Sequence, residues 1–91
     1  MSRRNGRITE RKIMLANEVG LHARPAARFV KLAAKFRSRI KVLKEKNEAD
    51  AKSITSILFL DAKMGEEITI WAQGEDSELA VETLAKLVTA F

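Results

Sequence analysis

The chain has 91 residues, 46% of them hydrophobic, which is enough for one small domain with two packed layers but not for two domains. It contains no cysteine and a single histidine, which excludes disulfides, thiolate chemistry and metal sites built from several Cys or His ligands. The net charge is +5, and no apolar run is long enough for a membrane span or a signal peptide, so we expect a cytoplasmic protein with no metal and no other cofactor.

The positive charge is distributed unevenly along the chain. Residues 1–12 carry five basic residues and one acidic residue, residues 13–52 carry ten and four, and residues 64–91 carry one and six. We predict that residues 1–8 form a basic, disordered N-terminal extension and that residues 9–91 form a single domain. A nucleic-acid-binding arm is the alternative interpretation of the basic extension.

The first half of the domain shows two kinds of periodicity. Residues 9–16 alternate and predict a strand, and residues 17–20 interrupt it. Apolar residues at helical spacing predict a helix over residues 22–36, with Pro25 in the first turn, where a missing N–H is tolerated. Residues 38–44 alternate again and predict the second strand.

The second half continues the same pattern with shorter elements. A turn at residues 44–47 leads to a short strand over residues 48–52, with Ala49 and Ala51 directed inward, and to a short helix over residues 53–60. Alternation over residues 66–73 predicts the last strand, and Asp76 or Ser77 is expected to cap the final helix. The order β-α-β-β-α-β-α indicates an α+β fold with an antiparallel sheet and helices on one face.

Most catalytic chemistries are excluded by what the chain lacks. With one histidine and no cysteine, the chain has little from which to build a nucleophile and an oriented base, and neither a GxGxxG motif nor a P-loop occurs. His22, however, lies at the predicted helix start, where free N–H groups and the helix dipole favour a phosphate. An imidazole nitrogen can be phosphorylated there, with the backbone of Ala23 and Arg24 and the Arg24 guanidinium around the phosphate. A surface histidine near a helix cap is the alternative that the residues alone leave open.

Three segments together resemble one known family. "GLHARPAARFV" (residues 20–30) is similar to the active-site motif of the histidine-containing phosphocarrier family, HPr, of the bacterial phosphoenolpyruvate-dependent sugar phosphotransferase system. "AKSITSIL" (residues 51–58) resembles the family's second signature, and residues 65–84 resemble its last strand and helix. The resemblance implies an open-faced β-sandwich, with four antiparallel strands covered on one face by three helices.

The resemblance also implies a function for the histidine. His22 is expected to accept a phosphoryl group on Nδ1 from phosphorylated enzyme I and to pass it to enzyme IIA proteins in sugar uptake. Arg24 matches the active-centre arginine of the family. The chain would then be a monomeric phosphoryl carrier and not an enzyme that turns over a substrate by itself.

Partner docking is expected around the histidine. The resemblance implies a docking surface that includes Arg28, Ile54, Ile57 and Leu58, and Phe29 is a further candidate that fits the core equally well. The basic residues of the predicted helix fit either electrostatic steering of acidic partners or a solvated helix face. They are Arg24, Arg28, Lys31 and Lys35.

Ser53 has a structural and a regulatory interpretation. It is a good helix N-cap, and Lys52-Ser53 also matches the site that HPr kinase/phosphorylase modifies in the family. A phosphoserine there would add negative charge to the surface on which enzyme I docks. Thr55 departs from the family, which usually has a large apolar residue at this position.

Two alternatives to the sugar carrier follow from other features. "LFLDAKMG" (residues 58–65), with Asp61 where the sugar branch more often has glycine, resembles the nitrogen-related paralogue of HPr, whereas Lys52-Ser53 resembles the sugar branch. The basic charge also fits a small nucleic-acid-binding module, but Trp71 and four phenylalanines are few for base stacking, and RNA-binding motifs are lacking.

Overall fold

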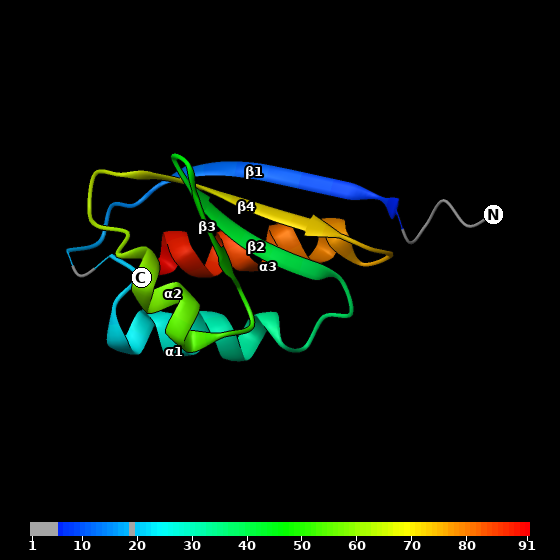
Figure 1. Cartoon of the computed structure of the whole chain (residues 1–91), viewed down its shortest axis with the longest axis horizontal. Helices are drawn as coiled ribbons and strands as arrows, with labels where there is room; N and C mark the ends of the chain where they lie inside the picture. Colours follow the sequence, from blue (N-terminus) through cyan, green and yellow to red (C-terminus); the bar gives the residue numbers. More distant parts are fainter. Residues whose placement is uncertain (1–5, 19) are drawn as a thin grey trace.

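The computed structural model describes residues 6–18 and 20–91, which form a four-stranded sheet with three helices packed on one of its faces (Figure 1). The element order is the predicted one. The elements are β1 (Ile8–Met14), α1 (Ala23–Ala33), β2 (Arg39–Lys44), β3 (Asn47–Asp50), α2 (Ile54–Leu60), β4 (Glu67–Gln73) and α3 (Ser77–Ala90).

The strands lie in the order β1-β4-β2-β3, and every neighbouring pair is antiparallel. β4 is therefore a central strand, with Ile68 opposite Ile13 of β1 and Ile70 opposite Val42 of β2. Because successive side chains of a strand point to opposite faces, this register places the branched apolar residues of three strands on one face. The predicted antiparallel open-faced sandwich is confirmed.

The helices cover that apolar face and complete the core. α3 packs against β1 and β4, while α2 packs against β3, and α1 contacts both other helices. Phe29 of α1 and Leu84 of α3 are fully buried, as are Ile68 and Ile70 beneath them. Phe29 therefore belongs to the core and not to an exposed docking surface.

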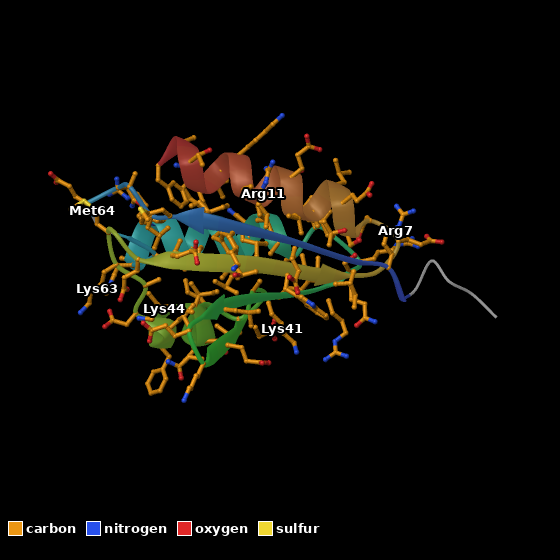
Figure 2. The ribbon with its side chains drawn as sticks, turned by 90° about the horizontal axis from the view of Figure 1, so that it is seen from above. Arg7, Arg11, Lys41, Lys44, Lys63 and Met64 are labelled. Carbon is orange, nitrogen blue, oxygen red and sulfur yellow. The ribbon has the colours of Figure 1, made fainter. Side chains whose placement is uncertain are left out.

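The opposite face of the sheet is open and polar. Lys41 lies over the ring of Trp71, with its Nζ 5.0 Å from the ring centroid, and also approaches Glu48 Oε1 at 3.1 Å. Figure 2 shows Lys41 over the sheet, well away from Lys63 and Met64 at one end. The predicted inward and outward alternation of residues 66–73 is confirmed by the burial of Ile68, Ile70 and Ala72.

Several predicted boundaries need correction. Ile8 already pairs with Gln73, and the carbonyl of Arg7 accepts a hydrogen bond from Gly74 N at 2.8 Å, so the sheet includes residues before Thr9. The rest of the predicted extension, residues 1–5, lies outside the described residues. α1 ends at Ala33 and not at residue 36.

Asp76 occupies the N-cap position of α3 but does not cap the helix with its side chain. Its carboxylate instead accepts hydrogen bonds from the N–H of Arg37 at 2.8 Å, from the N–H of Ser38 at 3.0 Å and from the Ser38 hydroxyl. Burial would raise the pKa of Asp76, but these hydrogen bonds outweigh burial and hold the pKa below its usual value of 3.8. The carboxylate thus ties the turn before β2 to the start of α3.

We predict that Asp76→Ala lowers the free energy of unfolding by about 1–2 kcal/mol at pH 7, since the lost hydrogen bonds involve a charged but partly solvated group. Because the folded-state pKa is depressed, this contribution is complete above the unfolded-state pKa and disappears as the pH falls from 3.8 through the folded-state pKa. Urea unfolding of both proteins at pH 7 and pH 3 measures it. A difference in stability that grows on acidification would contradict the assignment.

Candidate functional site

His22 is the N-cap residue of α1, and its backbone is extended, with φ −105° and ψ 163°. The first hydrogen bond into the helix runs from Ala26 N to the carbonyl of His22 at 3.2 Å. Pro25 has no N–H, so the N–H groups of Ala23 and Arg24 are the donors of the first turn that no helical carbonyl can accept. They directly follow His22, whose side chain makes no capping hydrogen bond.

A tight loop delivers His22 to this position. Gly20 has φ +60°, and a Cβ on it would lie 2.2 Å from the carbonyl oxygen of Ala62, so only glycine fits. The next residue, Leu21, is fully buried and donates its N–H to the same Ala62 oxygen at 3.0 Å. Asn17 closes the loop, since its Nδ2 donates to Gly20 O at 2.9 Å. The histidine loop is therefore fixed against the segment that follows α2.

That segment brings a carboxylate to the histidine. Nε2 of His22 lies 3.0 Å from Oδ1 of Asp61, and the two side chains are 47% and 50% exposed. Asp61 is the C-cap of α2 in the left-handed conformation, and its Oδ2 lies 3.4 Å from Nζ of Lys63. Desolvation would raise the pKa of Asp61, but the charge of Lys63 and the hydrogen bonds from Lys63 and His22 lower it below its usual value. The contact leaves Nδ1 as the ring nitrogen not engaged by Asp61.

Asp61 stands out in the sequence only as a departure from a family pattern, and its contact with His22 was not predicted. The pairing joins residues far apart in the sequence, through a backbone conformation that aspartate adopts less readily than glycine or asparagine. No local motif links the two residues, because His22 and Asp61 each lie in a segment without other histidines or acidic residues beside them.

A cavity of about 490 Å³ opens beside His22, with a largely apolar lining and two arginines. Arg28 lies over the ring of Phe91, with its guanidinium carbon 5.6 Å from the ring centroid, and Figure 1 shows the C-terminal end of the chain near the start of α1. The cavity is lined by Asn17, His22, Ala23, Arg24, Pro25, Arg28 and Phe91. Another cavity, of about 340 Å³ along β2 and β3, contains none of the predicted site residues.

The α2 residues divide between surface and core. Ile54 and Leu58 are 41% and 40% exposed, as a docking surface requires, but Ile57 is fully buried and the prediction that it docks a partner is corrected. Its side chain faces the same way as that of Leu60, one helical turn on, which is also buried. Phe59, which the sequence analysis did not select, is 91% exposed.

Ser53 caps α2 as predicted. Its hydroxyl accepts a hydrogen bond from Ser56 N at 3.2 Å, and the residue is half-buried. Lys52 beside it donates from Nζ to the carbonyl of Phe36 at 2.7 Å, which ties the start of α2 to the end of the α1 segment.

Metal and membrane sites receive no support from the described part of the chain. Within residues 6–18 and 20–91, no group of three or more His, Cys, Asp or Glu side chains could hold a metal ion. Over the same residues, none of the helices has the length and apolar character needed to cross a membrane.

Known proteins with the same features are phosphocarriers. Residues 9–90 match the family described as "PTS HPr component phosphorylation site". The chain is 35% identical over 81 residues to the phosphocarrier protein NPr of Shewanella violacea, covering 89% of both chains. It is 42% identical over 71 residues to the phosphocarrier protein HPr of Lysinibacillus sphaericus, covering 78% of this chain and 81% of the relative. A crystal structure of HPr from Thermoanaerobacter tengcongensis superimposes with a TM-score of 0.87 at 41% identity, covering 90% and 92% of the two chains.

We predict that Gly20→Ala lowers the free energy of unfolding by about 3 kcal/mol and displaces the histidine loop, because the new Cβ would collide with the Ala62 carbonyl. Gly65→Ala is the matched control, since Gly65 also has positive φ but no atom within 4 Å of the added Cβ. It should cost only about 1 kcal/mol. Thermal or urea unfolding measures both, and equal losses would rule out the collision.

Proposed function

The chain belongs to the HPr family of phosphocarrier proteins, and on this basis we propose that His22 carries the phosphoryl group on Nδ1. It receives the group from phosphorylated enzyme I and passes it to enzyme IIA proteins in sugar uptake. The observation that supports this most strongly is the half-exposed imidazole at the start of α1, with Asp61 engaging only Nε2. No other described side chain combines a free nucleophilic nitrogen with a helix N-terminus.

Transfer needs no cofactor in this scheme. The lone pair of Nδ1 attacks the phosphorus of the donor phosphohistidine, the donor's N–P bond breaks, and a new N–P bond forms on His22. The N–H groups of Ala23 and Arg24 and the nearby Arg24 guanidinium offer donors to the phosphoryl oxygens. Delivery to an enzyme IIA histidine is the same displacement in reverse, with His22 as the leaving group.

The surface around His22 is suited to two successive protein partners. Arg24, Arg28 and Lys31 are exposed on α1, and Ile54 and Leu58 are exposed on α2, which packs against α1. We assign docking to this combination of a charged helix face and apolar side chains. Cationic residues at its rim would raise the association rate with acidic partners and make that rate dependent on salt.

A carrier of the nitrogen-related branch is the second candidate. It is favoured by Asp61, where the sugar branch more often has glycine, and by the 35% identity with a relative named NPr. Both branches use the same residues at His22, so the assignment of a branch depends on which enzyme IIA accepts the phosphoryl group. Competition between a sugar-type and a nitrogen-type enzyme IIA for the phosphorylated carrier separates the two candidates.

Ser53 is the regulatory position in this proposal. Its hydroxyl lies at the start of α2, one residue before exposed Ile54. Phosphorylation by an HPr kinase/phosphorylase would place a dianion beside the docking surface without unfolding α2, because a helix N-terminus tolerates negative charge. Enzyme I would then dock more weakly and phosphorylate His22 more slowly.

We predict that incubation with phosphoenolpyruvate and enzyme I adds one acid-labile phosphoryl group, seen by intact mass. Arg24→Ala should slow this step roughly tenfold, since a charge-assisted hydrogen bond to the phosphoryl group is lost. Lys35→Ala, in the exposed turn that follows α1, is the matched control for loss of one positive charge. His22→Ala should show no adduct, and an undiminished adduct in that variant would refute the proposal.

For Ser53, we predict that ATP and HPr kinase/phosphorylase give an acid-stable adduct that Ser53→Ala lacks. The aspartate variant Ser53→Asp, which retains a capping oxygen, should be phosphorylated on His22 more slowly than the wild-type chain. Ser56→Ala controls for loss of a hydroxyl in the same helix. If Ser53→Asp accepts the phosphoryl group at the wild-type rate, charge at this position does not regulate docking.

A further inference from the structure

We propose that Asp61 is a positioning residue, which holds the His22 ring with its proton on Nε2 and directs Nδ1 toward the incoming phosphorus. The inference rests on the proposed function of His22 and adds a residue that acts through it. The observation behind it is the 3.0 Å contact between His22 Nε2 and Asp61 Oδ1.

The chemistry of the pair determines which nitrogen is the nucleophile. An ionised carboxylate only accepts hydrogen bonds, so the nitrogen facing it must carry the proton. A neutral imidazole has one protonated and one unprotonated nitrogen, and a proton on Nε2 leaves the lone pair on Nδ1. Carboxylates orient histidines in this way at metal sites and in catalytic triads.

The backbone of Asp61 is held in place by contacts that do not involve His22, and its Oδ2 lies 3.4 Å from Lys63 Nζ. The carbonyl of Asp61 accepts a hydrogen bond from Lys44 Nζ at 3.0 Å, and its N–H donates to Leu58 O at 3.1 Å. Ala62, the next residue, accepts the Leu21 N–H, which lies beside His22. The backbone that carries the Asp61 carboxylate is therefore fixed independently of the His22 ring.

A second set of contacts fixes the rest of the segment. Glu66 Oε1 accepts from Lys63 N at 2.8 Å and lies 3.4 Å from Lys44 Nζ. The Lys63 backbone hydrogen bond, together with the hydrogen bond and charge of Lys44, holds the pKa of Glu66 below its usual value despite desolvation. Figure 2 shows Lys44, Lys63 and Met64 toward one end of the molecule, opposite Arg7.

The charge of Asp61 also suits the product of the transfer. When Nδ1 bonds to phosphorus while Nε2 keeps its proton, the ring gains a positive charge. The Asp61 carboxylate compensates that charge, and when the N–P bond later breaks, the electron pair returns to Nδ1 and the ring is neutral again. No proton has to leave or enter the ring during either transfer.

Two variants and two measurements test the inference. In Asp61→Gly, we expect the transfer of the phosphoryl group from phosphorylated enzyme I to His22 to slow roughly tenfold. This is the lower end of the effect seen when a carboxylate that orients a metal-bound histidine is removed. Nitrogen-15 NMR of the unphosphorylated protein should show the His22 proton on Nε2 alone in the wild-type chain and shared with Nδ1 in the variant. Asp61→Asn, which can still accept from Nε2–H, should restore the wild-type proton position and part of the rate.

Glu45→Gly is the matched control. Glu45 and Asp61 both have φ +55°, but Glu45 lies in the turn between β2 and β3, away from the site. Its replacement by glycine therefore relieves the same backbone strain without changing the surroundings of His22. It should change neither the rate nor the NMR spectrum of His22. If Asp61→Gly leaves either measurement at its wild-type value, the inference is wrong. A wild-type chain that accepts no phosphoryl group would instead overturn the proposed function, while the proton position would still test the Asp61 contact.

Discussion

The close approach of Gly20 to the backbone of Ala62 is the constraint on which the site depends. It brings two loops together that the sheet topology alone would leave independent, one before α1 and one after α2. Leu21 is buried, and its N–H donates to the Ala62 carbonyl. The position of His22 at the start of α1 is therefore restrained. Restrained backbone therefore places three groups next to one another. They are the His22 imidazole, the free N–H groups of α1 and the Asp61 carboxylate.

This arrangement reconciles exposure with order. In the function proposed above, the reactive nitrogen must reach two different proteins in turn, so the group cannot lie in a closed cavity. Loops that present reactive groups are usually the mobile parts of a fold. Here backbone hydrogen bonds restrain the loop, while the side chains of His22 and Asp61 remain about half exposed. The reacting side chains are therefore open to solvent, whereas their positions are determined by buried backbone contacts.

The sequence predicted the elements well and the contacts between them less well. Alternation and helical spacing identified all seven elements, because each has a clear apolar face, and the single Pro and His identified the start of α1. Ile57 was assigned wrongly because "ILFL" is apolar on every side and gives no contrast from which to read its helical phase. The side-chain contacts of Asp61 and Asp76 were not predicted because their partners come from distant segments, which no local pattern reveals.

The strand order has a consequence for how the chain acquires this structure during synthesis on the ribosome. β1 and β2 do not touch as a pair, since β4 lies between them, and β4 is translated long after both. Until residues 67–73 emerge, the first two strands have no central partner and the apolar faces of the helices have no complete sheet to cover. Assembly must therefore be a late and concerted event, and a truncated nascent chain would expose the surfaces that promote aggregation.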